Sequence, residues 1–193
     1  MSPGLDKTSL RVRLRGLRRR LATEIPDAAQ RAAERLPLAR LPRYRVFGLY
    51  HAMGSEMDPM PLMYELHSGD AKPTLPVALD RDSPLVFRLW SKGMRLEPDA
   101  LGVPAPVPIM PVLTPDLVVV PLLGFDRKGG RLGQGAGHYD RTLKNLKAQR
   151  AVFVLGLAFS GQEIDAVPTD AHDQRLDAIL TETGYIEVAR ERS

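Results

Sequence analysis

The chain has 193 residues, of which 44% are hydrophobic and 26% charged, a composition typical of one compact soluble domain. It contains no cysteine, which excludes disulfides, thiolate metal sites and cysteine nucleophiles. No apolar run approaches the roughly 18 residues that a membrane helix needs, and no signal-peptide core is present, so we expect a cytoplasmic protein that does not contact membranes.

Positive charge is concentrated near the N-terminus. Residues 1–45 hold twelve Lys and Arg against four Asp and Glu, although the net charge of the whole chain is only +4. This asymmetry is compatible with a nucleic-acid-binding arm. It is also compatible with a helix that donates cations to a polyphosphate ligand.

The N-terminal residues predict two helices. Four leucines recur at helical spacing within residues 6–21 and form an apolar face: Leu10, Leu14, Leu17 and Leu21. Four cations form a parallel basic stripe beside it: Lys7, Arg11, Arg15 and Arg18. The Ala- and Arg-rich residues 27–40 predict the second helix. We expect one domain, residues 1–193, in which residues 1–42 form a helical arm.

The rest of the chain alternates between strand and helix patterns. Strands are predicted at residues 45–50, 72–79, 85–90, 116–123, 151–159 and 185–188. Helices are predicted at residues 59–68, about 137–147 and about 174–183. The alternation indicates an α/β fold, with a three-layer, Rossmann-like arrangement of a mostly parallel sheet flanked by helices. The proline-rich residues 98–115 are compatible with an interdomain linker, but we favour a long loop within one domain.

The most informative segment is residues 124–141, which connect a buried-strand pattern to an amphipathic helix. Three glycines occupy alternate positions there and let backbone N–H groups turn toward an anion: Gly133, Gly135 and Gly137. Their spacing matches neither the Walker pattern nor the dinucleotide fingerprint, and a flexible connection is the alternative interpretation. Arg131 offers a planar fork for phosphate oxygens, and Asp140 offers a magnesium ligand. In such sheets ligands bind beyond the carboxyl ends of the strands, where loops 51–58, 124–138 and 160–173 should converge.

With these features assembled, the chain resembles the 5-formyltetrahydrofolate cyclo-ligase, or methenyltetrahydrofolate synthetase, family over nearly its whole length. The most specific element is residues 131–141, Arg-Leu-Gly-Gln-Gly-Ala-Gly-His-Tyr-Asp-Arg. It is similar to the family's Arg-Leu-Gly-x-Gly-x-Gly-Tyr-Tyr-Asp-Arg signature. Four weaker elements occur in the family's order: Lys7 with Arg11, Tyr50 with Glu56, residues 87–106, and Pro168 through Asp173.

The resemblance implies a ligase that forms a C–N bond. It would convert 5-formyltetrahydrofolate and ATP, with Mg²⁺, into 5,10-methenyltetrahydrofolate, ADP and phosphate. In the family's mechanism the γ-phosphoryl group moves to the formyl oxygen, and the neighbouring folate nitrogen then closes the ring. The implied partner is this small-molecule folate, with or without a polyglutamate tail, and not nucleic acid or a membrane. We expect a monomer.

The resemblance also implies roles for individual residues. Those expected to bind ATP are Lys7, Arg11, Arg131, Leu132, Gly133, Gln134, Gly135, Ala136, Gly137, His138 and Tyr139. Those expected to bind the folate are His51, Glu56, Gln134, Gly135, Ala136, Gly137 and His138. Arg131 is the catalytic candidate, because it can stabilise charge on the moving phosphoryl group. Asp140 and Asp173 match the magnesium carboxylates.

Two residues depart from the family's pattern. His138 stands where tyrosine is usual, and Ala136 stands where glycine or lysine is common. A neutral imidazole can still stack and donate one hydrogen bond, so we expect altered affinity or pH dependence rather than lost activity. Ala136 constrains the loop more strongly if its φ must be positive.

Taken without the family, the same residues allow other interpretations. A sugar-phosphate isomerase-like enzyme would need a carboxylate base at the loop and no ATP. A nucleic-acid-binding protein would use the basic arm, although that arm lacks interleaved aromatic residues. Asp173 on local sequence alone is typical of an N-cap for the helix expected from about Gln174.

Overall fold

A computed structural model describes residues 6–67 and 70–189. Its α-helices and 3-10 helices are α1 (Lys7–Glu24), α2 (Ala28–Glu34), η1 (Leu38–Arg40), α3 (Met60–Leu66), α4 (His138–Gln149) and η2 (Ser160–Gln162). Its strands are β1 (Val46–Gly48), β2 (Lys72–Val77), β3 (Val86–Leu89), β4 (Leu96–Pro98), β5 (Pro104–Pro106), β6 (Leu117–Pro121), β7 (Gly124–Phe125), β8 (Arg131–Leu132), β9 (Phe153–Leu157), β10 (Ala178–Thr181) and β11 (Gly184–Glu187).

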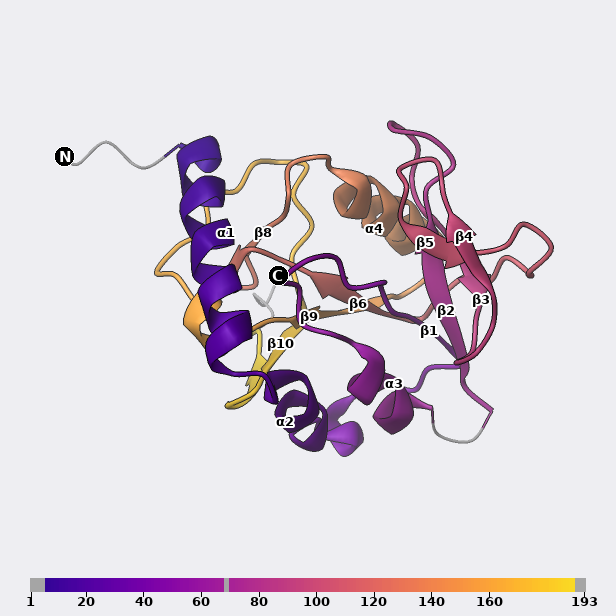
Figure 1. Cartoon of the computed structure of the whole chain (residues 1–193), viewed down its shortest axis with the longest axis horizontal. Helices are drawn as coiled ribbons and strands as arrows, with labels where there is room; N and C mark the ends of the chain where they lie inside the picture. Colours follow the sequence, from indigo (N-terminus) through magenta and orange to yellow (C-terminus); the bar gives the residue numbers. More distant parts are fainter. Residues whose placement is uncertain (1–5, 68–69, 190–193) are drawn as a thin grey trace.

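Seven strands form the main sheet, in the order β11-β10-β9-β6-β1-β2-β3 (Figure 1). The pairs that join β10, β9, β6, β1 and β2 are parallel, whereas β3 and β11 are antiparallel edge strands. Two small antiparallel sheets, β4-β5 and β7-β8, are formed by the connections. The predicted α/β fold with a mostly parallel sheet between helices is therefore confirmed.

Strand β6 occupies the centre because both of its faces are apolar. Leu117 and Val119 join a core with residues of α2 and α3, whereas Val118 and Val120 join a second core with Leu143 of α4. These four β6 side chains are 0% exposed. Burial on both faces is typical of a central parallel strand covered by helices on each side.

Helix α1 packs its apolar face beside the glycine-rich segment. Leu10 and Leu14 are buried in a third core with Leu123 and Leu132. Asp6 caps the helix, because its carboxylate accepts hydrogen bonds from the backbone N–H groups of the first turn. This packing fixes the basic side of α1 next to the loop that follows β8.

The predicted helix over about 174–183 is wrong. Strand β10 lies there, parallel to β9 and antiparallel to β11. All four β10 residues are buried, and a segment that is buried on both faces and paired along both edges is satisfied as a strand. Its apolar residues also occur at helical spacing, so periodicity alone does not separate the two structures.

Other differences concern the lengths of elements. The second predicted helix, 27–40, is interrupted: α2 ends at Glu34, and Pro37, which lacks an N–H donor, precedes the short η1. The predicted loop 98–115 contains strand β5, which pairs with β4 at the start of that loop. Residue 68 of the predicted helix 59–68 lies outside the described residues, as do residues 1–5 of the predicted arm. Within the described ranges, no helix has the length and apolarity needed to cross a membrane.

Candidate active site

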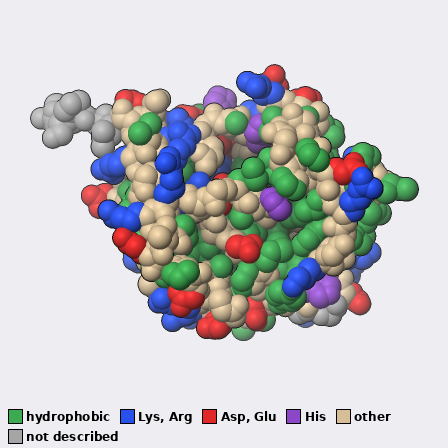
Figure 2. Space-filling model, in the orientation of Figure 1, with side chains coloured by type: hydrophobic (Ala, Val, Ile, Leu, Met, Phe, Trp, Pro, Cys, Tyr) green, Lys and Arg blue, Asp and Glu red, His purple; other side chains and the backbone are tan. Residues whose placement is uncertain are grey.

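A cavity of about 840 Å³ lies beyond the carboxyl ends of β1, β2 and β6. Figure 2 shows basic side chains gathered along α1 and apolar side chains across the middle of the same face. The loops after β1 and β6, as well as residues 170–173, contribute to the wall, as expected for ligands at this edge of a parallel sheet. The cavity is lined by every residue proposed from the sequence for ATP, folate or magnesium binding. The structure thus brings those residues together, while their roles stay predictions.

The glycine-rich loop leads directly into helix α4. Gly135 and Gly137 have positive φ angles of 109° and 71°, whereas Gly133 and Ala136 do not adopt this conformation. The conformational restriction considered for Ala136 therefore does not arise. Gly137 is the N-cap of α4, and no side chain caps the helix there. The first N–H groups of α4 are consequently available to an anion in the cavity.

Two members of the basic stripe of α1, Arg11 and Arg15, contact this loop. Arg11 Nε donates to the Gly133 carbonyl at 3.1 Å. Arg15 donates to both the side-chain oxygen and the carbonyl of Gln134, at 3.0 and 3.1 Å. These contacts hold the backbone of the loop against the helix through its carbonyl groups, which leaves its N–H groups for a ligand.

Lys7 contacts the other wall of the cavity. Its ammonium group lies 2.9 Å from Asp170 Oδ2 and 2.8 Å from Asp173 Oδ2. Hydrogen bonds to Asp173 and Asp170 raise the pKa of Lys7, so the cation is firmly retained at neutral pH. Asp170 was not selected from the sequence, and only its position near Asp173 hinted at a contact.

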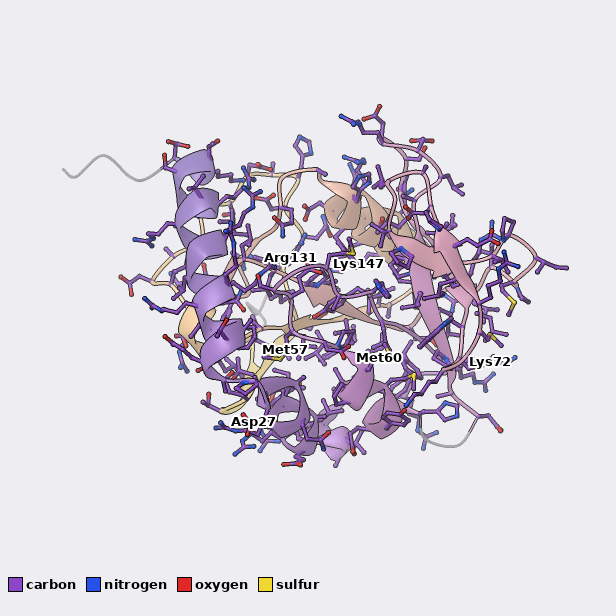
Figure 3. The ribbon with its side chains drawn as sticks, in the orientation of Figure 1. Asp27, Met57, Met60, Lys72, Arg131 and Lys147 are labelled. Carbon is purple, nitrogen blue, oxygen red and sulfur yellow. The ribbon has the colours of Figure 1, made fainter. Side chains whose placement is uncertain are left out.

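Arg131 lies between α1 and α4 (Figure 3) with its side chain only 3% exposed. Its Nη2 donates to Asp140 Oδ1 at 2.6 Å, and its guanidinium carbon lies 6.0 Å from the ring centre of Tyr139. The Nε atom of Arg131 is buried and has no hydrogen-bond partner. Because a buried donor is rarely left unsatisfied, an oxygen atom of a ligand is the expected partner.

Asp140 and Asp173 are the two carboxylates predicted to hold magnesium. Asp140 Oδ1 also accepts from the backbone N–H of Gln174 at 3.0 Å, so the two carboxylates lie on neighbouring segments. Among the described residues, the second oxygen of each carboxylate makes no hydrogen bond, and no group of three or more candidate metal ligands occurs. One or two carboxylates suit Mg²⁺ when phosphate oxygens and waters complete its shell. No helix begins at Gln174, so the N-cap interpretation of Asp173 is wrong.

The opposite end of the cavity holds Glu56, whose side chain is 9% exposed. Its Oε2 accepts from the Met53 backbone N–H at 3.0 Å, and its Oε1 lies 3.6 Å from Arg18 Nη1. Tyr50 donates its hydroxyl to the Met57 carbonyl, and burial raises the pKa of this phenol. Apolar residues also line the cavity, among them Met53, Pro76, Leu85, Leu101 and Val103.

His138 is oriented by Arg141, which was not selected from the sequence. Arg141 Nη2 lies 3.2 Å from His138 Nδ1. Because a guanidinium group only donates, Nδ1 is the acceptor and a neutral ring carries its proton on Nε2. Arg141 Nη1 also donates to the Ala136 carbonyl at 3.0 Å. The three-residue helical spacing between His138 and Arg141 was the sequence signal for this contact.

The fold and the cavity together define an α/β protein whose candidate ligand site lies at the carboxyl edge of a mostly parallel sheet. The sequence identifies the family within this class of α/β proteins. Residues 4–182 match the 5-formyltetrahydrofolate cyclo-ligase family, and the chain belongs to this family. The resemblance carried by residues 131–141 is confirmed.

Individual relatives agree with this assignment. The 5-formyltetrahydrofolate cyclo-ligase of Mycolicibacterium smegmatis is 30% identical over 192 residues, covering 94% of this chain and 95% of the relative. The mouse cyclo-ligase is 42% identical over 69 residues, and the match spans 35% of this chain and 34% of the mouse protein. The solved 5,10-methenyltetrahydrofolate synthetase of Aquifex aeolicus has a TM-score of 0.77 and 26% identity, covering 97% of this chain and 95% of that one.

Proposed function

We propose that the protein catalyses the ATP- and magnesium-dependent cyclisation of 5-formyltetrahydrofolate to 5,10-methenyltetrahydrofolate, with release of ADP and phosphate. Membership of the cyclo-ligase family supports the reaction. The structural observation that carries the proposal is Arg131, whose buried Nε has no partner beside the uncapped start of α4. A phosphoryl group would satisfy both sets of donors.

The ATP side of the cavity would act through position and charge. Lys7 and Arg11 would contact the phosphates from α1, and the N–H groups at the start of α4 would donate to them. Asp140 and Asp173 would hold Mg²⁺, which supplies charge neutralisation on the phosphates. Arg131 would donate to the phosphoryl group as it moves to the formyl oxygen. Phosphoryl transfer depends mainly on such positioning and electrostatic stabilisation.

The folate side would orient the second substrate. Glu56 accepts hydrogen bonds and suits the N–H groups of a pterin ring, while His138 presents an Nε2–H donor beside the glycine-rich loop. The apolar part of the lining favours a flat aromatic ligand. This arrangement would bring the folate nitrogen to the activated formyl carbon, so that ring closure is intramolecular within the bound folate.

Nucleotide-dependent stability tests the ATP half of this proposal. At a ligand concentration of about 100 times Kd, Mg-ATP should stabilise the protein by about 2.7 kcal/mol, measured as a rise in Tm. Lys7→Met should reduce this rise because it removes a phosphate-binding cation. Arg13→Met is the matched control, since Arg13 is exposed on α1 and does not line the cavity. Absence of stabilisation in the wild-type protein would contradict ATP binding and favour a sugar-phosphate isomerase-like enzyme.

A further inference from the structure

Arg18 is a cation at a position of α1 where the pattern favours an apolar residue. It follows Leu14 by four residues and precedes Leu21 by three, and it is only 6% exposed. Burial lowers the pKa of Arg18, which reflects the cost of removing a guanidinium group from water. Nearby groups must offset that cost, and their identity indicates what the side chain does.

The partners of Arg18 come from two segments that line the cavity. Its Nε donates to Ser55 Oγ at 3.1 Å, and its Nη1 donates to the Leu122 carbonyl at 3.2 Å. The same Nη1 lies 3.6 Å from Glu56 Oε1. One guanidinium group therefore connects helix α1, the loop after β1 and the end of β6.

These contacts determine how Glu56 is presented to a ligand. Its Oε2 is held by the Met53 N–H, and its Oε1 faces the positive charge of Arg18. The side chains of Arg18 and Glu56 are 7% and 9% exposed, so the attraction between them is only weakly screened by solvent. Without Arg18, Glu56 Oε1 would lose the cation that faces it. Only the hydrogen bond from the Met53 N–H to Oε2 would then hold the carboxylate.

We propose that Arg18 is a positioning residue for the folate end of the cavity, holding the Glu56 carboxylate in the orientation that accepts hydrogen bonds from the pterin ring. This inference rests on the proposed function. It differs from the roles of Lys7 and Arg11 on the same helix, because Arg18 acts through Glu56 and not on the phosphates. Its loss should thus affect folate binding much more than ATP binding.

A double-mutant cycle tests this role. Kd for 5-formyltetrahydrofolate is measured by calorimetry for the wild type, Arg18→Met, Glu56→Gln and the double variant, together with KM for ATP. Arg18→Met should weaken folate binding about tenfold in the wild-type background but less than about twofold in the Glu56→Gln background. KM for ATP should change less than about twofold, and Arg18→Lys should recover part of the folate affinity. Arg19→Met, on an exposed neighbour, is the matched control.

The outcomes separate positioning from a general structural role. Equal losses of folate affinity in both backgrounds would overturn the proposal, as would a lower Tm with unchanged folate affinity. If Arg18→Met does not fold, the same cycle with Arg18→Lys should show a smaller but still non-additive loss, and additive losses there would also overturn it. Absence of folate binding by the wild-type protein would instead reject the proposed function on which the inference rests.

Discussion

The cations around the cavity differ in how firmly the protein itself holds them. The Arg131 side chain is 3% exposed and pairs with Asp140, whereas the Lys7 side chain is 28% exposed and divides its contacts between Asp170 and Asp173. A buried guanidinium group is fixed before any ligand arrives. Lys7, by contrast, would have to exchange a carboxylate for a phosphate oxygen. We therefore expect Lys7 to influence ATP affinity and Arg131 to influence the rate of the chemical step.

The Lys7–Asp170 ion pair gives the protein a specific dependence on acid. A hydrogen bond from Lys7 holds the pKa of Asp170 below its ordinary value of 3.8. Because the pKa of Asp170 is lowered in the folded protein, the ion pair stabilises the fold fully above about pH 4. This stabilisation disappears as the pH falls through the pKa of Asp170 in the folded state. The Tm difference between wild type and Asp170→Asn should accordingly shrink between about pH 6 and pH 3. Asp82→Asn, at an exposed carboxylate, is the control; a difference that grows on acidification would contradict the assignment.

At the level of elements, local sequence predicted secondary structure best where its pattern fits only one kind of element. Residues 117–123 are apolar throughout, and the structure places residues 117–121 in the doubly covered strand β6. Residues 174–183 carry apolar side chains at a spacing that also suits a helix, and only the pairing with β9 and β11 makes this segment a strand. Strand pairing depends on distant residues, so local periodicity could not predict it.

Two glycine substitutions test the assigned backbone conformations. Gly16 lies within α1, and a Cβ atom there would meet nothing within 4 Å, so Gly16→Ala should stabilise the protein by about 0.5–1 kcal/mol. Gly137 has a φ of 71°, and its Cβ atom would lie 2.8 Å from Arg141 Nη1, so Gly137→Ala should destabilise it by about 1–2 kcal/mol. Denaturant unfolding measures both changes. Effects of the same sign would contradict the described start of α4.

At the scale of the whole molecule, α1 joins the two ends of the cavity. Its first turns bring Lys7 and Arg11 to the end of the cavity proposed to hold the phosphates, and its later turns bring Arg18 to Glu56. The family resemblance implied phosphate-binding roles for Lys7 and Arg11. Arg18 could not be assigned in that way, because its contact with the Leu122 carbonyl joins residues 104 positions apart. Its function depends on how α1 packs against the sheet.

The most direct test of the central claim is the appearance of the methenyl product. Purified protein, 5-formyltetrahydrofolate and Mg-ATP are mixed, and the absorbance band of 5,10-methenyltetrahydrofolate is followed together with ADP release. We predict that the band rises with one ADP formed per product, and that omission of ATP or Mg²⁺, or the Asp140→Ala substitution, prevents the rise. A wild-type protein that binds Mg-ATP and the folate but forms no methenyl product would contradict the account.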